Sequence, residues 1–137
     1  MSDAFSEVLS AIRFNEDGLV PAIAQQVGTG EVLMMAWMNR EAVIETLTTG
    51  RVCYWSRSRR GLWRKGETSG QMQHLKEFLI DCDGDTLLLL VQQDGVACHT
   101  GRRACFFRAV RDGALETVLD VETDPTVLYG SNKSTHS

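Results

Sequence analysis

The stretch that decides the fold runs from residue 71 to residue 93 and reads QMQHLKEFLI-DCDGD-TLLLLVQQ. It predicts two long strands, over residues 71–82 and 86–93, which are joined at the DCDGD motif. The second run is rich in leucine, as expected for a strand in the core of a protein. The two strands are therefore part of the predicted core of the protein, and the motif joins them.

The alternating carboxylates of the DCDGD motif bear on metal binding. Side chains alternate between the two faces of a strand. If the strand stays extended, Asp81, Asp83 and Asp85 project to one side and Cys82 projects to the other. Carboxylates are ligands of hard cations such as Mg²⁺, and thiolates are ligands of Zn²⁺. We therefore expect the aspartates to gather one ion, while Cys82 reaches a separate site, such as one in another subunit.

Two other interpretations of the motif differ in strength. Asp and Gly are common turn residues, so a simple polar turn between two strands accounts for the same letters. A calcium-binding EF-hand loop is excluded, because it needs glycine at its sixth position and glutamate at its twelfth. Here Gly84 is at the fourth position and Gln92 is at the twelfth.

Two further cysteines lie close together in the segment CHTGRRAC, residues 98–105. Residues 100–103 can form a tight turn with Gly101 at its first central position, and in that register Cys98 faces Cys105 across a hairpin. Two thiols placed in this way make half of a tetrahedral zinc site. A disulfide fits the same geometry. However, four cysteines without a signal peptide indicate a reducing compartment, where disulfides are rare.

The composition sets bounds on the class of protein. A chain of 137 residues is long enough for one domain with its own core, which we place at residues 1–130, followed by a disordered tail over residues 131–137. There is no apolar run of about 20 residues and no positive stretch at the N-terminus, so we expect a cytoplasmic protein. The formal net charge of −4 argues against a general nucleic-acid binder.

The rest of the chain adds strands and one clear helix. Asn39 can cap a helix that carries Val43, Ile44 and Leu47 on one face, and Gly50 can end it. Apolar residues at helical spacing mark an amphipathic lead-in before residue 14. Further strands are predicted over residues 19–27, 31–38, 51–57, 62–65, 96–98, 105–111 and 114–119. The fold class is therefore α+β and mainly β, a compact antiparallel or mixed sheet or pseudo-barrel.

The loop GETSG, residues 66–70, has the composition of a phosphate-binding loop. Backbone N–H groups and hydroxyls in such a loop can approach a phosphate, and Arg57, Arg59, Arg64 and Lys65 supply positive charge nearby. Taken alone, the pattern also fits a solvated loop beside a basic edge strand. The fourth cysteine, Cys53, stands apart from the others and is expected to be a small core residue.

Five pieces of the sequence, taken in order, resemble one known family. They are MMAWMN (residues 34–39), YWSRSR (54–59), LWRKGETSG (62–70), the DCDGD motif and the hairpin from Cys98 to Cys105. Together they resemble phosphoribosyl-AMP cyclohydrolase of histidine biosynthesis, in its monofunctional form. The segment QMQH after Gly70 departs from the commonest family pattern, which puts a role for His74 in doubt.

The resemblance implies a homodimer with two metal sites in each subunit. By position, Cys82, Cys98 and Cys105 match zinc ligands that are shared between subunits, and Asp81, Asp83 and Asp85 match magnesium ligands. The substrate is expected to contact Arg57, Arg59, Trp63, Lys65, Glu67 and Ser69. The only expected partners are the nucleotide substrate and a second copy of the chain, with no nucleic acid and no membrane.

The implied reaction opens a purine ring. The substrate is an adenine nucleotide with a second phosphoribosyl group on N1. Zinc-activated water adds at C6, the N1–C6 bond breaks, and the product is a ring-opened imidazole carboxamide with a formimino group. Three thiolates should acidify water less than three histidines would, so a nearby base is needed. His99, next to Cys98, is the candidate for this base. The alternative is that His99 is only a surface residue of the turn.

A function of another class stays open at this point. A structural-zinc module could bind single-stranded RNA through Tyr54, Trp55, Trp63 and the arginines, because aromatic side chains can stack on bases. Three thiols in place of four count against it, since structural zinc sites are normally closed by four protein ligands. The net negative charge counts against it as well.

Overall fold

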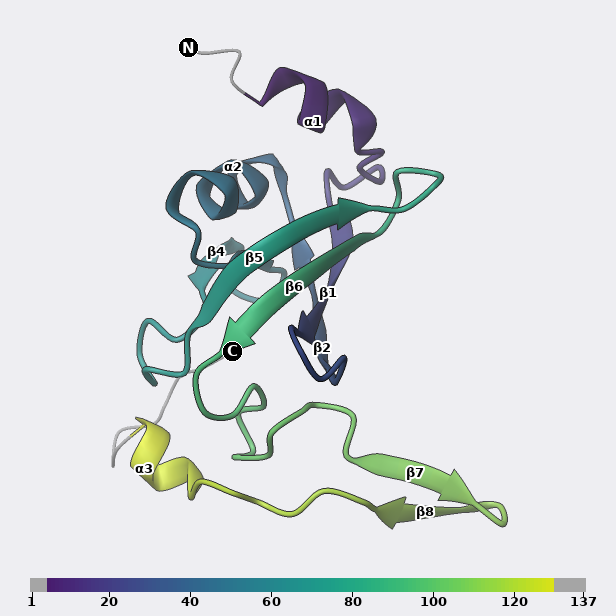
Figure 1. Ribbon diagram of the computed structural model, residues 1–137, viewed down its shortest axis with the longest axis vertical. Helices are drawn as coiled ribbons and strands as arrows, with labels where there is room; N and C mark the ends of the chain where they lie inside the picture. The colour runs from purple at the N-terminus through teal and green to yellow at the C-terminus, as the bar shows by residue number, and fades with distance from the viewer. Residues whose placement is uncertain (1–4, 130–137) are drawn as a thin grey trace.

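The computed structural model describes residues 5–129, and the predicted tail over residues 131–137 lies outside this part (Figure 1). No helix of the described part is long and apolar enough to cross a membrane. The elements in chain order are α1 (Ser6–Ala11), β1 (Val20–Gln26), β2 (Val32–Met38), α2 (Arg40–Thr49), β3 (Cys53–Ser56), β4 (Gly61–Arg64), β5 (Gln73–Ile80), β6 (Leu87–Gln93), β7 (Arg108–Arg111), β8 (Ala114–Thr117) and α3 (Pro125–Tyr129).

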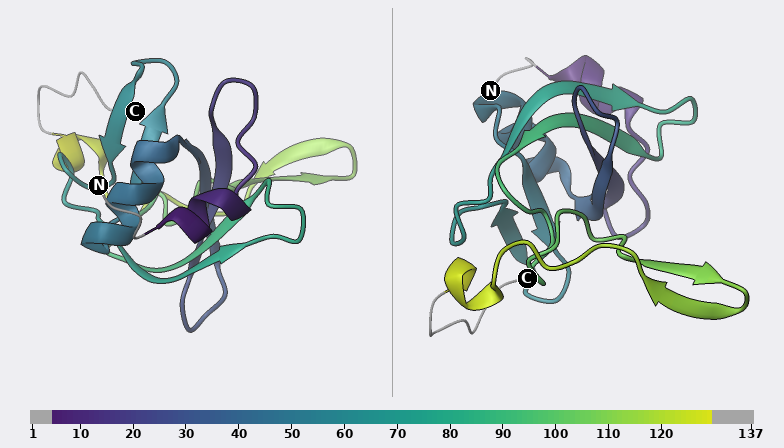
Figure 2. Two further views of the ribbon diagram at one scale, coloured as in Figure 1. Left: turned by 90° about the horizontal axis from the view of Figure 1, so that it is seen from above. Right: turned by 60° about the horizontal axis from the view of Figure 1, so that its bottom comes forward.

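Six of these strands form one curled sheet in the order β4-β3-β2-β1-β6-β5. Neighbouring strands are antiparallel except for β1 and β6, which are parallel. The sheet curls like half of a barrel, and α2 lies within the curl (Figures 1 and 2). A mainly β fold with a mixed sheet is therefore confirmed. Helix α3 was not predicted.

The core follows the alternation of side chains along the strands. Leu87, Leu89 and Val91 on β6 are completely buried, as are Val20 and Ala22 on β1. These residues point to one face of their strands, because strand side chains alternate with a period of two. Each buried leucine or valine stabilises the fold by about 1.5–3 kcal/mol relative to an exposed one.

Helix α2 begins and ends as its sequence predicts. The Asn39 side chain accepts a hydrogen bond from the Ala42 N–H at 2.9 Å, which satisfies one of the free donors of the first turn. Gly50 ends the helix in the left-handed conformation, with a φ of 77°. Thr46 turns inward, and its hydroxyl accepts a hydrogen bond from the Cys53 N–H at 2.9 Å. Cys53 is 1% exposed, which confirms it as a core residue.

The DCDGD motif is a turn, so the prediction that β5 continues extended through Cys82 is wrong. Strand β5 ends at Ile80, and the Gly84 N–H then donates to the Asp81 carbonyl at 3.0 Å. The Asp81 carboxylate also accepts a hydrogen bond from the Asp85 N–H at 3.1 Å. Gly84 has a φ of 76°, a left-handed conformation that glycine adopts without strain. The alternation of faces inferred for the three aspartates and Cys82 therefore does not apply.

The segment that carries Cys98 and Cys105 is also a turn, which we call the cysteine turn, residues 96–105. The strands predicted over residues 96–98 and 105–107 are not formed, and β7 starts only at Arg108. The tight turn lies earlier than predicted, because the Gly101 N–H donates to the Cys98 carbonyl at 2.9 Å. The Cys98 N–H then pairs with the Arg102 carbonyl at 3.1 Å.

Two apolar regions remain exposed in the single chain. Strand β2 is an interior strand of the sheet, but Val32 and Met35 on it are 44% and 43% exposed. Strands β7 and β8 form a hairpin that projects from the body (Figure 2, right). On this hairpin Val110 is 73% exposed and Leu115 is 65% exposed.

Candidate active site

A cavity of about 210 Å³ opens where β4, the loop after it and the cysteine turn meet. All of the predicted substrate-binding and catalytic residues line it, with the exception of Arg57, and so does one of the predicted zinc ligands. The lining residues are Met34, Arg59, Leu62, Trp63, Arg64, Lys65, Gly66, Glu67, Thr68, Ser69, Ala97, His99 and Cys105. Segments some 30 residues apart in the sequence thus meet at one cavity.

Two walls of this cavity are defined by short segments. The first is the loop over residues 66–69, which we call the hydroxyl loop because it carries Thr68 and Ser69. It folds back on itself through a hydrogen bond from the Gly70 N–H to the Gly66 carbonyl at 2.8 Å. The second wall is the cysteine turn, which contributes Ala97, His99 and Cys105.

Arg57 lies elsewhere. Its guanidinium stacks over the Trp37 ring, 4.9 Å from the ring centroid. It lines a second cavity of about 350 Å³ together with Trp55 and Arg60. Within one chain, Arg57 is therefore separate from the other predicted substrate-binding residues.

Lys65 lines the cavity but is largely buried against the cysteine turn. It is only 8% exposed, and its ammonium donates a hydrogen bond to the Ala97 carbonyl at 2.8 Å. Burial lowers the pKa of Lys65, although the nearby Cys105 and Cys98 act in the opposite direction. The side chain therefore fastens β4 to the cysteine turn and places a positive charge beside the two thiols.

The thiols of Cys98 and Cys105 are hydrogen-bonded to each other. The structure thus brings the two cysteines together, although through a turn and not through the predicted hairpin ladder. The Cys105 N–H donates to the Leu33 carbonyl at 2.7 Å, and the Thr100 hydroxyl donates to the Cys98 sulfur at 3.1 Å.

The two thiols share one proton. The hydrogen bond from Cys105 lowers the pKa of Cys98 most, and the Thr100 hydroxyl and His99 add to this effect, so that the pKa falls to about 5 against the effect of burial. The same hydrogen bond raises the pKa of Cys105, because Cys105 keeps the proton beside a negative neighbour. At neutral pH the pair therefore consists of one thiolate and one thiol.

The donor chemistry of this pair fits zinc, but one chain does not supply a full set of ligands. Among residues 5–129, no group of three or more His, Cys, Asp or Glu side chains is placed to hold a metal ion. Cys82 is exposed on the turn before β6, whereas Cys98 follows the other end of that strand. Seven residues of strand separate the two turns by about 20 Å, at roughly 3.3 Å per residue. Within one chain, Cys82 therefore lies far from Cys98 and Cys105.

The three aspartates are all exposed on the turn between β5 and β6. Their carboxylates fit a hard cation by chemistry, but in this chain they do not form a closed cluster. His74 lies outside the cavity, where its Nε2 is 2.8 Å from an oxygen of Asp94.

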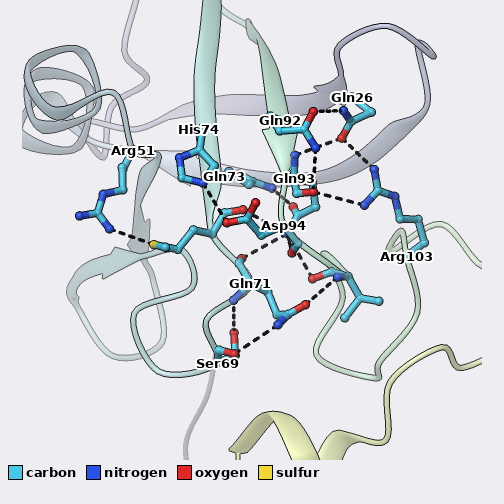
Figure 3. Close-up of polar contacts among 12 residues, drawn as sticks. Gln26, Arg51, Ser69, Gln71, Gln73, His74, Gln92, Gln93, Asp94 and Arg103 are labelled. Carbon is cyan, nitrogen blue, oxygen red and sulfur yellow. Dashed lines mark hydrogen bonds and ion pairs between the residues drawn. The ribbon is translucent and has the colours of Figure 1, made fainter.

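A group of buried glutamines beside the cavity was missed from the sequence. Gln26, Gln73 and Gln93 are 6%, 0% and 2% exposed, and hydrogen bonds connect them to Arg103 and to the cysteine turn (Figure 3). A signal was available, because Gln93 continues the inward-facing positions of the apolar strand β6. A polar side chain at such a position needs partners inside the protein.

Comparison with known proteins identifies the family of the chain. The model of the phosphoribosyl-AMP cyclohydrolase family matches residues 34–107. The phosphoribosyl-AMP cyclohydrolase of Rhodospirillum centenum is 70% identical over 95% of this chain and 98% of its own length. The corresponding proteins of Paramagnetospirillum magneticum and Granulibacter bethesdensis are 72% and 68% identical, over 89% and 92% of this chain and 92% and 99% of their own lengths. The chain therefore belongs to the phosphoribosyl-AMP cyclohydrolase family.

Proposed function

We propose that the protein hydrolyses the N1–C6 bond of the adenine ring in 1-(5-phosphoribosyl)-AMP, a step of histidine biosynthesis. The observation that carries the proposal is the cavity, which gathers positive charge, hydroxyls, an aromatic ring, a histidine and a cysteine of the thiol pair. Membership of the family supports the same reaction. The protein is then a hydrolase that acts on a cyclic amidine.

The walls of the cavity suit a nucleotide. Arg59 supplies positive charge for a phosphate, and the hydroxyls of Thr68 and Ser69 can donate hydrogen bonds to its oxygens. The Trp63 ring can stack on the purine, and the Glu67 carboxylate can accept a hydrogen bond from a ribose hydroxyl. Binding by several weak contacts fixes the reacting ring relative to the cysteine turn.

The chemistry requires one water and two proton transfers. The water oxygen forms a bond to C6, and one of its protons passes to the exocyclic nitrogen on C6. The N1–C6 bond then breaks, the C6 oxygen becomes a carbonyl, and the second proton passes to N1. His99 lines the cavity beside Cys98, and a histidine at this place can act as the acid or base that carries such a proton.

A zinc ion held by Cys82, Cys98 and Cys105 would supply Lewis acidity, which brings the ionisation of an attacking water closer to neutral pH. Lys65 balances part of the negative charge of the thiolates, since its ammonium is buried beside them. A magnesium ion held by Asp81, Asp83 and Asp85 would neutralise substrate phosphate. Asp83→Asn is therefore expected to weaken the magnesium dependence and substrate binding while zinc stays in place.

The working unit in this proposal is a homodimer that shares its zinc ligands. The distance between the two ends of β6 supports it, because Cys82 of the same chain does not reach the thiol pair. The exposed apolar surface supports it as well. Val110 and Leu115 on the projecting hairpin, and Val32 and Met35 on β2, offer a surface that a second copy can cover.

The test is ultraviolet absorbance during incubation with 1-(5-phosphoribosyl)-AMP, because opening of the purine ring changes the chromophore. The proposal predicts a change that depends on enzyme concentration and stops when a chelator removes zinc. An RNA-binding module would leave the spectrum unchanged. That alternative also loses part of its stacking surface in the structure, since Tyr54 is completely buried and packs 5.4 Å from the Trp63 ring.

A further inference from the structure

The two walls of the cavity are connected by side-chain amides that do not line it. Gln71 follows the hydroxyl loop, and Gln93 ends strand β6 just before the cysteine turn. Neither residue is part of the cavity lining. We infer that Gln71 and Gln93 are positioning residues, which set the hydroxyl loop and the cysteine turn at the separation that catalysis needs. The inference rests on the proposed function of this cavity.

Gln71 forms a direct bridge between the two walls (Figure 3). Its side-chain oxygen accepts a hydrogen bond from the Val96 N–H at 2.8 Å, at the start of the cysteine turn. Its side-chain nitrogen donates to the Ser69 carbonyl at 3.3 Å, and its own N–H donates to the Ser69 hydroxyl at 3.2 Å. One side chain thus contacts the last residue of the hydroxyl loop and the first residue of the cysteine turn.

The backbone is shaped to admit this bridge. Gly95 has a φ of 66°, and a Cβ added to it would collide with the side-chain oxygen of Gln71. Only glycine therefore allows the chain before Val96 to approach the amide so closely. A Gln71 side chain that only contacted solvent would not require glycine at position 95.

Gln93 forms a second connection between the same two segments, from a buried position. It is 2% exposed, and its side-chain nitrogen is surrounded by four backbone carbonyls. They belong to Gln71 at 3.2 Å, Met72 at 3.4 Å, Asp94 at 2.9 Å and Val96 at 3.3 Å. Carbonyls from the segment that follows the hydroxyl loop and from the start of the cysteine turn thus converge on one amide.

A chain of buried groups fixes which way the Gln93 amide points. The Tyr54 hydroxyl donates to the Gln73 side-chain oxygen at 2.8 Å, and the Gln73 nitrogen donates to the Gln93 oxygen at 2.9 Å. This leaves the Gln93 nitrogen facing the carbonyls. Because every donor in the chain has an acceptor, rotation of one amide would leave buried polar groups unpaired, which is costly.

The decisive experiment compares Gln71→Met with Gln92→Met. Methionine has nearly the length of glutamine but neither donates nor accepts strongly. Gln92 is an exposed glutamine on β6 whose side chain bonds only to neighbouring Gln26 and Gln93, so it connects neither wall to the other. Turnover of 1-(5-phosphoribosyl)-AMP is followed by absorbance, and backbone amide hydrogen exchange is measured without substrate.

We expect Gln71→Met to lower kcat about 10²-fold with a smaller change in KM, because each wall survives but their relative placement shifts. Exchange of the Val96 amide should accelerate about fivefold, the effect of one lost hydrogen bond. Gln92→Met should leave both quantities near wild type. In Gln71→Glu the carboxylate still accepts from the Val96 N–H, so exchange at Val96 should stay slow.

The outcomes separate the two proposals. If the wild type does not open the ring, the proposed function fails, while the exchange data still report on the bridge. If the wild type turns over but Gln71→Met matches Gln92→Met in kcat and in Val96 exchange, the positioning role is overturned. A Gln71→Met protein that loses kcat only in proportion to its unfolded fraction, measured by circular dichroism, overturns it as well.

Discussion

The two ends of strand β6 carry the two cysteine-bearing turns of the chain, and they are built differently. At one end, Asp81, Cys82 and Asp83 are exposed on a turn that is held by its own backbone and one carboxylate. At the other end, side chains from several elements hold the cysteine turn. Lys65 binds the Ala97 carbonyl, and Arg103 binds the Gly95 carbonyl at 2.5 Å and the Gln26 side chain at 2.7 Å.

This difference indicates which half of the proposed zinc site is formed in advance. The cysteine turn is fixed by buried contacts in the single chain, so its two thiols are in place before any metal or second subunit arrives. The DCDGD turn has few contacts beyond the hydrogen bond from the Arg13 N–H to the Gly84 carbonyl, at 2.6 Å. Its ligands would gain their geometry from the partner, from the metals or from both.

The largest expected effect distinguishes the three proposed zinc ligands from the fourth cysteine, Cys53. Cys98→Ala should lose zinc and all turnover, because it removes the thiolate of the preformed pair. Cys53→Ala should keep its zinc, since Cys53 is a core residue that contacts Thr46. Zinc is measured per chain by atomic emission after purification. Full zinc in Cys98→Ala together with its loss in Cys53→Ala would reverse the assignment.

The second effect concerns the proton carrier at the cysteine turn. His99→Ala should retain zinc and dimerisation but lose about 10²- to 10⁴-fold in turnover, the usual contribution of a positioned acid or base. Turnover per zinc-loaded dimer is measured across pH for both proteins. An unchanged rate and pH profile would exclude His99 and direct attention to Glu67, which lines the same cavity.

The third effect is on stability, and it compares a buried side chain at the end of β6 with an exposed side chain on the turn before β6. Gln93→Glu should lower the free energy of unfolding by about 3 kcal/mol, because it directs a carboxylate at four carbonyls in a buried position. Asp83→Asn, an equally small change on the exposed turn, should alter it by no more than about 0.5 kcal/mol. Urea denaturation of the metal-free proteins measures both. Equal losses would show that the two turns are held equally firmly.

The smallest effect is a pH dependence of the metal-free protein. Between pH 5 and about 8.5, the folded thiol pair binds one proton where the unfolded chain binds two, because the pKa of Cys98 is lowered to about 5. Stability from this pair therefore rises with pH in that window. Above it the raised pKa of Cys105 reverses the trend. The difference in melting temperature between wild type and Cys98→Ala should accordingly peak near pH 8.5, and a difference independent of pH would contradict the shared proton.

Most of the regular structure could be predicted from local patterns. The cap at Asn39, the glycine stop at Gly50 and the leucines of β6 are short-range signals, and all three are confirmed. The geometry of the DCDGD turn and of the cysteine turn was harder to predict, because it depends on contacts with residues that are distant in the sequence. Gly101, for example, packs against the Thr123 carbonyl, and the sequence gives no hint of that neighbour.

In the candidate site as well, some features could be predicted from the sequence and others depended on tertiary contacts. The residue types of the hydroxyl loop and the cysteine turn suggested a common site, and the structure places them around one cavity. The burial of Lys65 between Trp63 and the cysteine turn was not predicted, because it depends on tertiary packing. The contact of Gln71 was not predicted for a similar reason, since its hydrogen-bond partner Val96 is 25 residues away in the sequence.

Complementation between two inactive variants tests most directly whether the two ends of β6 complete one another across subunits. Cys82→Ala and Cys98→Ala are each expected to be inactive, because each removes one ligand from every site of its homodimer. When the two are unfolded together and refolded with zinc, half of the dimers should be hybrids, and each hybrid should contain one intact site. Ring opening should then recover to about a quarter of wild-type turnover, as expected for random pairing in a two-fold dimer. A mixture that stays inactive, although dimers form and zinc is present, would contradict the shared site.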